Sequence, residues 1–128
     1  MVRDAGSKFK ELVDLMEYMR GPKGCAWDKE QTIEDFSKHL KNESDEVLEA
    51  ISRKDYPNLR EELGDLLWNI VFISQIALEE GFFTIEDVIN DVNEKIVRRH
   101  PHVFGGERIS DPDEIIRRWH EIKRDEKK

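Results

Sequence analysis

One long apolar segment with helical periodicity, running from about Leu59 to Glu80, constrains the fold more than any other part of the sequence. It is the most apolar part of a 128-residue chain. Gly81 follows directly and is typical of the glycine that ends a helix. The longest strongly apolar stretch within it, Leu66 to Leu78, is interrupted by polar residues and is too short to cross a bilayer. We therefore expect a buried helix in a globular domain.

Four further segments have helical periodicity, and start or stop residues bound most of them. They are a stripe from Phe9 to Met19, a segment from Thr32 to about Arg53, a segment from Ile85 to about Arg99 and a last segment beginning at Asp111-Pro112, with loops over 21–31 and 102–110. Thr32 with Asp35, and Thr84 with Asp87, have the spacing of capping boxes. No strand pattern and no internal repeat is visible. We predict a single all-α domain over residues 1–128, a four-helix-type bundle with an additional terminal helix.

The composition limits the partners that we expect. Asp and Glu outnumber Lys and Arg by 29 to 21, which gives a formal charge of −8 and disfavours a nucleic-acid polymer or an anionic membrane as partner. The single cysteine, Cys25, cannot form an internal disulfide, and the N-terminal residues lack the apolar core of a signal peptide. We therefore expect a reduced, cytoplasmic setting without membrane attachment.

Two carboxylate pairs share the same spacing inside neighbouring predicted helices: Glu43 with Glu46, and Glu62 with Asp65. Residues three apart lie on one face of a helix. If these two helices meet in an antiparallel hairpin, four carboxylates converge on one point, as in a site for a hard cation such as Mg²⁺. The same spacing is also found on solvated acidic surfaces, so the spacing alone leaves both interpretations open.

The helical wheel favours the metal site. At about 100° per residue, one strip of the long apolar helix begins acidic and becomes apolar, with the members Glu62, Asp65, Asn69, Phe72 and Ile76. On the preceding helix, Glu43 lies at the edge of the inward stripe of Ile33, Phe36, Leu40, Val47 and Ile51, while Asp45 and Glu49 point away. Buried carboxylates without a partner are costly, so a cation is the economical explanation. Asn69 either orients a ligand, adds a carbonyl oxygen or is a satisfied buried amide.

Four motifs in order, each weak alone, give the chain a specific resemblance. They are Gly24 to Thr32 (GCAWDKEQT), Glu43 to Ile51 (ESDEVLEAI), Leu59 to Leu67 (LREELGDLL) and Arg98 to Phe104 (RRHPHVF). Together they resemble the MazG family of nucleoside triphosphate pyrophosphohydrolases, within the all-α NTP pyrophosphatase superfamily. That family's signature reads Glu-Glu-x-x-Glu, then Glu-x-x-Asp. The match implies that Glu43, Glu46, Glu62 and Asp65 are the catalytic metal ligands, and it puts Asn42 where the first signature glutamate would stand.

The resemblance implies Mg²⁺-dependent hydrolysis of nucleoside triphosphates at the α–β phosphate link, giving NMP and pyrophosphate and clearing surplus nucleotides. Mn²⁺ is an alternative ion. It also implies a homodimer or higher homo-oligomer. Two alternatives stay open: a relative specific for dUTP, dCTP or phosphoribosyl-ATP, and a non-catalytic metal-binding helical module, which the substitution at Asn42 favours. The sequence does not identify the general base.

Cations for a triphosphate are expected from the end of the 85–99 helix. Lys95, Arg98 and Arg99 cluster there, although basic residues at a helix C-terminus also complement the helix dipole. In the last helix Trp119 and Lys123 lie one turn apart. The resemblance extends to this Trp-x-x-x-Lys pair and implies base stacking beside a phosphate contact; ordinary packing is the alternative.

Trp27 is the last predicted substrate contact. It lies in a loop rich in special residues, where a tryptophan is less easily explained as core, and its neighbours Asp28 and Lys29 either contact substrate or fix the loop. His100 and His102 flank a proline and receive no catalytic role.

Overall fold

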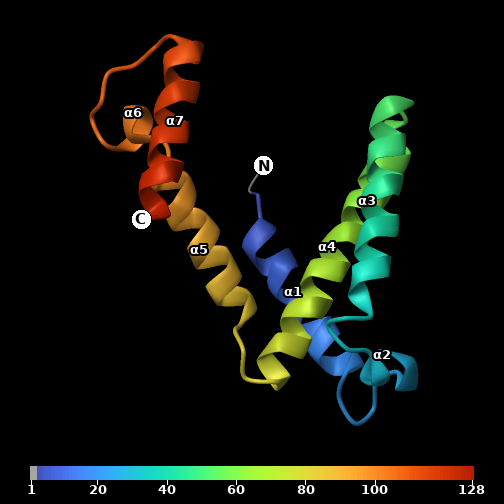
Figure 1. Ribbon diagram of the computed structural model, residues 1–128. Helices are drawn as coiled ribbons and strands as arrows, with labels where there is room; N and C mark the ends of the chain where they lie inside the picture. The colour runs from blue at the N-terminus through green and yellow to red at the C-terminus, as the bar shows by residue number, and fades with distance from the viewer. Residues whose placement is uncertain (1–2) are drawn as a thin grey trace. The chain divides into compact units, whose positions relative to one another are not determined.

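The protein is described by a computed structural model covering residues 3–128, which form seven helices and no strand (Figure 1). The helices are α1 (Ala5–Met19), α2 (Ala26–Glu30), α3 (Phe36–Ser52), α4 (Tyr56–Glu79), α5 (Ile85–Arg98), α6 (Pro101–Phe104) and α7 (Pro112–Glu126). The predicted all-α class is confirmed for these residues. No helix among them is long and apolar enough to cross a membrane.

The chain divides into two compact units, the first ending at Ile85 and the second beginning at Glu86. The first contains α1 to α4, and the second contains α6, α7 and all of α5 except its first residue. Each unit is described by itself below. The expectation of a single domain over residues 1–128 stays a prediction.

The predicted capping box before α3 is present. The Thr32 N–H donates to Asp35 Oδ2 at 2.9 Å, and the Asp35 N–H donates to Thr32 Oγ1 at 3.3 Å. A short turn, in which the Phe36 N–H donates to the Ile33 carbonyl at 3.0 Å, leads from this box into the helix. The box therefore closes this turn, and α3 itself begins at Phe36, four residues later than the predicted start at Thr32.

Both ends of α4 follow from local sequence. Asp55 caps the N-terminus by accepting from the Asn58 N–H at 3.2 Å, so the helix begins one turn before the predicted Leu59. At the other end Gly81 has φ +78°, a conformation that glycine adopts without strain. Its N–H donates to the Leu78 carbonyl at 3.1 Å, and the next N–H donates to the Ala77 carbonyl at 2.9 Å, as in a Schellman motif. The predicted glycine stop is confirmed.

The core of the first unit lies where α1 and α3 pack on α4. Its fully buried members are Met16, Phe36, Val71, Phe72 and Ile76. The rings of Phe36 and Phe72 lie 4.3 Å apart between centroids and join α3 to α4. Each such side chain stabilises the fold by about 1.5–3 kcal/mol through burial. Figure 1 shows the resulting hairpin, with α3 and α4 side by side.

The prediction that α4 is a buried helix is correct for only one of its faces. Residues such as Val71 and Phe72 are buried, but a row at helical spacing is open to solvent: Leu63, Leu67, Ile70 and Leu78, which are 38–49% exposed. In the first unit, α1 and α3 together are too few to surround α4. Ile51, predicted to face inward from α3, is likewise 53% exposed.

Both predicted loops contain a short helix, α2 in the first and α6 in the second. The first loop is fastened by Arg20, whose side chain is only 7% exposed. Its guanidinium donates to the carbonyl of Asp28, within α2, and to the carbonyl of Gln31, directly after α2. Directly before the second predicted loop, Pro101 starts α6 because a first-turn proline lacks only an N–H that would be unpaired there.

Candidate active site

Three of the four predicted carboxylates converge between α3 and α4. Glu43 on α3 and Glu62 and Asp65 on α4 each offer one carboxylate oxygen, and these three oxygens lie within 4.8 Å of one another. The hairpin turn between Ser52 and Tyr56 makes the helices antiparallel, so the pairs meet at the same level. Glu43 and Glu62 are half-buried, and Asp65 is exposed at the rim.

Glu46 lies next to this cluster although it is not one of the three converging residues. The pKa of the Glu46 carboxyl is raised above its ordinary value, first because its protonated form hydrogen-bonds Glu62 and then because Glu62 is negatively charged. Burial and the charge of Asp65 add to the shift. All four predicted residues therefore interact electrostatically at one place.

Two oxygens in the cluster are shielded from solvent without any partner among residues 3–128: Glu43 Oε1 and Glu62 Oε2. Two ionised carboxylates have no proton to share, so neither can satisfy the other. The pKa of Glu62 is raised, chiefly because its protonated form donates to Glu43, with burial and the charges of Glu43 and Asp65 contributing. A bound proton or cation would relieve this repulsion.

The oxygen-only donor set fits a hard divalent cation. Carboxylate oxygens are the ligands that Mg²⁺ and Ca²⁺ prefer, and a cation would satisfy both shielded oxygens at once. Asn69, one turn beyond Asp65 on α4, is half-buried. Its three predicted alternatives stay open.

The predicted cations lie on the second unit, and two of them already bind a carboxylate. Arg98 Nε lies 2.5 Å from Glu126 Oε2, and Arg99 Nη2 lies 2.8 Å from Glu126 Oε1. These hydrogen bonds, the one from Arg99 first, lower the pKa of Glu126 to about 2. Lys95 is exposed and has no ion-pair partner within the described part of the chain.

Two of the predicted cations form cation–π contacts with the Trp119 ring. Lys123 Nζ lies 4.5 Å from the ring centroid, and the Arg99 guanidinium carbon lies 5.5 Å from it. These side chains are predicted from the sequence to be functional, whereas Glu126 is not among the predicted residues. Its partners Arg98 and Arg99 lie 28 and 27 residues away, so spacing along a helix gives no signal for it.

Trp27 is on α2 in the first unit and is 52% exposed, with Asp28 beside it buried. Its ring packs edge-on with the His39 ring, at 5.7 Å between centroids. His39 is not among the residues predicted from the sequence. Its position four residues before Glu43 on the same helix is the signal that could have identified it.

Comparison with known proteins identifies the family. The MazG nucleotide pyrophosphohydrolase domain matches residues 31–104, more than half of the chain and the part that carries all four carboxylates. The chain belongs to the MazG nucleotide pyrophosphohydrolase domain family. The resemblance predicted from the four motifs is confirmed.

Named MazG relatives cover nearly the whole chain. The nucleoside triphosphate pyrophosphohydrolase/pyrophosphatase MazG of Thermotoga maritima is 48% identical over 98% of this chain and 48% of its own length. The nucleoside triphosphate pyrophosphohydrolase of Escherichia coli K12 is 42% identical over 94% of this chain and 46% of its own. The chain thus spans about half the length of these curated relatives.

A solved structure has a similar fold. The crystal structure of a mazG-related protein from Thermotoga maritima matches with a TM-score of 0.74 and 33% sequence identity, covering 90% of this chain and 98% of that one. The two chains therefore share a fold over most of their length.

Proposed function

We propose that this protein is a Mg²⁺-dependent nucleoside triphosphate pyrophosphohydrolase that clears surplus nucleotides. The observation that carries the proposal is a pair of shielded oxygens, on Glu43 and Glu62 beside Asp65, that have no hydrogen-bond partner in the described part of this MazG family member. The names of the Thermotoga maritima and Escherichia coli relatives support this activity.

Glu43, Glu62 and Asp65 would hold the cation, with Glu46 as the fourth carboxylate. Mg²⁺ suits this set of oxygens, and Mn²⁺ is the alternative ion. When bound, the metal neutralises phosphate charge and lowers the pKa of an attacking water. Asn42 is exposed on α3 and can supply neither charge nor a proton acceptor comparable to a carboxylate. The four remaining acids must therefore suffice for catalysis.

The proposed reaction is attack of water on the α-phosphorus. The new bond joins the water oxygen to this phosphorus, the bond to the α–β bridging oxygen breaks, and the bridging oxygen leaves with pyrophosphate. The water gives up a proton, and the products are NMP and pyrophosphate. Phosphoryl transfer needs positioning and charge neutralisation more than covalent help, which suits a site built of acids.

Lys95 and Lys123 are the proposed phosphate contacts among the cations, because neither is paired with a carboxylate within residues 3–128. Arg98 and Arg99 would first have to exchange Glu126 for a phosphate oxygen. Trp119 already bears two cations, so its proposed role is to position Lys123 beside the phosphates rather than to stack on a base.

A homodimer or higher homo-oligomer completes the proposal. The exposed row of Leu63, Leu67, Ile70 and Leu78 on α4 is an apolar face of the kind that buries against another helix. Association of two hairpins through it would bring four helices together.

A nucleotide panel tests the proposed activity. The purified protein is incubated with each NTP and dNTP in Mg²⁺, and NMP, pyrophosphate and orthophosphate are measured. NMP and pyrophosphate in equal amounts are expected from several nucleotides. Turnover of one nucleotide alone would favour a dUTP, dCTP or phosphoribosyl-ATP type of specificity. No turnover would favour the non-catalytic module, and orthophosphate release would contradict the proposed bond.

A further inference from the structure

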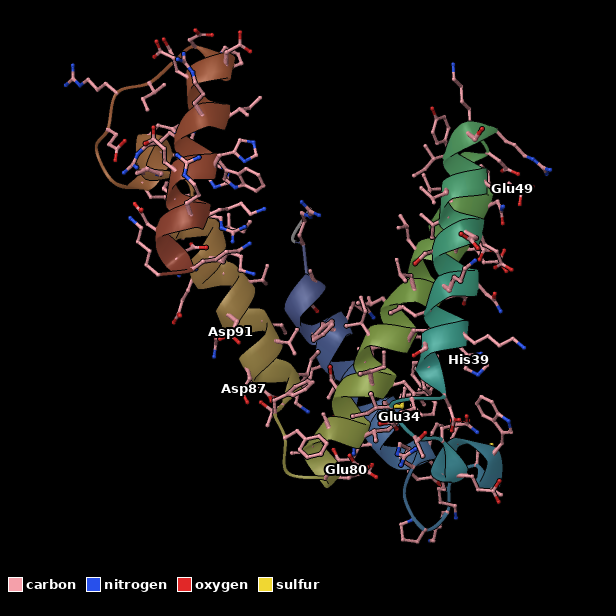
Figure 2. All side chains as sticks on the ribbon, viewed as in Figure 1. Glu34, His39, Glu49, Glu80, Asp87 and Asp91 are labelled. Atoms are coloured by element: carbon pink, nitrogen blue, oxygen red, sulfur yellow. The ribbon has the colours of Figure 1, made fainter. Side chains whose placement is uncertain are left out.

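A partly exposed aromatic pair lies on the first unit, and one of its members is on α3, the helix that carries Glu43. It consists of Trp27 on α2 and His39 on α3, whose ring planes meet at 71°. Figure 2 labels His39 near the N-terminal end of α3, the end that follows α2 in the chain. Trp27 is 52% exposed, so much of this large ring faces solvent instead of packing in the core.

Both rings are held from behind. The His39 ring lies 5.2 Å from the buried Phe36 ring, which itself packs on Phe72 in the core. On the α2 side, the Trp27 carbonyl accepts from Gln31 Nε2 at 2.9 Å, and Arg20 fixes the same turn through its bonds to backbone carbonyls. The exposed ring is therefore presented by a fixed support, which reduces the entropy lost when a ligand packs on it.

The register of α3 relates this pair to the metal site. His39 precedes Glu43 by four residues, so the two share a helix face about 6 Å apart along the axis. Both belong to the first unit, together with Glu62 and Asp65. A nucleotide with its phosphates at the carboxylates can extend along α3 and bring its base to the aromatic pair.

We infer that Trp27 and His39 form a nucleobase-stacking platform for the substrate. The base would lie on the exposed face of Trp27, with the His39 ring bracing the indole from its edge. Every base has a π-face, so this contact accepts purines and pyrimidines alike and supplies affinity with little selectivity. The inference rests on the proposed function, because it takes the nucleotide's phosphates to be at the carboxylate cluster.

The test compares a ligand that has a base with one that lacks it. Calorimetric titrations in Mg²⁺ use α,β-methylene-ATP, which is not cleaved at the α–β link, and inorganic tripolyphosphate. Trp27→Ala and His39→Ala are expected to weaken binding of the nucleotide by about 5- to 150-fold, as loss of a base–aromatic contact does. The affinity for tripolyphosphate should stay within about twofold of the wild-type value. His39→Phe keeps a ring at this position and should therefore bind the nucleotide with nearly the wild-type affinity. Tyr18→Ala, which removes a ring that is 59% exposed on α1, is the matched control.

Each outcome bears on the inference. If Trp27→Ala and His39→Ala lose affinity equally for the nucleotide and for tripolyphosphate, the two residues have a purely structural role and the inference is overturned. Unchanged nucleotide affinity would also overturn it, as would a nucleotide-specific loss in Trp119→Ala instead of Trp27→Ala. If the variants show the expected binding pattern but the wild-type protein turns over no NTP, the proposed activity is contradicted while the platform is supported. A wild-type protein that binds neither ligand would overturn both.

Discussion

Arg20 and Glu79 form a two-point ion pair across 59 residues of sequence: Nε lies 2.8 Å from Oε2, and Nη2 lies 2.9 Å from Oε1. The guanidinium also bonds to the carbonyls of Asp28 and Gln31 and lies 5.6 Å from the Phe72 ring centroid. One nearly buried cation thus joins the end of α1, the turn that carries Trp27, and the last turn of α4.

Arg20→Ala should destabilise the fold by about 2 kcal/mol, because it leaves charged and carbonyl acceptors without their donor. Urea unfolding measures the loss. The control is Arg53→Ala, which removes a solvent-exposed pair with Glu49 and should change stability by no more than about 0.5 kcal/mol. Equal effects of the two substitutions would refute a special role for Arg20.

Gly24 should not tolerate a side chain. A Cβ at this position would lie 2.0 Å from the Met19 carbonyl oxygen, so the backbone of the turn would have to shift. Gly24→Ala is expected to lower the unfolding free energy by more than about 1 kcal/mol. Gly6→Ala, on an open face of α1, should instead stabilise by up to about 1 kcal/mol. Thermal melts of both variants compare the two sites, and a neutral Gly24→Ala would contradict the packing of this turn.

Without metal, the carboxylate cluster should make stability fall as pH rises. The pKa values of Glu46 and Glu62 are raised above 4.5, so the folded state holds protons there that the unfolded state has released. The stabilisation is complete below about pH 4.5 and is lost as pH rises through the raised values. Glu62→Gln removes one of the repelling charges. In EDTA at pH 8, the melting temperature of Glu62→Gln should be higher than that of the wild-type protein. This difference in melting temperature should shrink as the pH falls toward 4.5.

Added Mg²⁺ should reverse that order. A ligand that binds only the folded state stabilises it by about 2.7 kcal/mol at 100 times its dissociation constant. Wild type should therefore gain melting temperature with Mg²⁺, while Glu62→Gln gains little. A wild-type melting curve indifferent to both pH and Mg²⁺ would count against a cation at this cluster.

The carboxylates could be brought together from sequence because their signal is local. Helix periodicity, the Thr32/Asp35 box and the Gly81 stop fix two neighbouring helices, and a short turn forces them to run antiparallel. Spacing then places Glu43 opposite Glu62 and Asp65.

Other features depend on partners distant in sequence. Whether Ile51 or Leu67 is buried depends on which helix covers it. The apolar pattern indicates that another element can pack on these residues but does not identify that element. The engagement of Arg98 and Arg99 by Glu126 likewise needs α7 to fold back on α5, which a charge count does not reveal. Trp27 and His39 meet across the turn between α1 and α3, which Arg20 fastens through two backbone carbonyls.

The most direct test of the proposed catalytic metal site is a measurement of Mg²⁺-dependent pyrophosphate release. It compares the wild-type protein with Glu43→Gln and Glu49→Gln. Both substitutions remove one charge from α3, but Glu43 faces the cluster and Glu49 pairs with Arg53 in solvent. Wild type and Glu49→Gln should release NMP and pyrophosphate equally, whereas Glu43→Gln should lose at least about a hundredfold in rate, as the loss of electrostatic transition-state stabilisation does, with its helical circular dichroism unchanged. Near-normal release by Glu43→Gln would contradict the account.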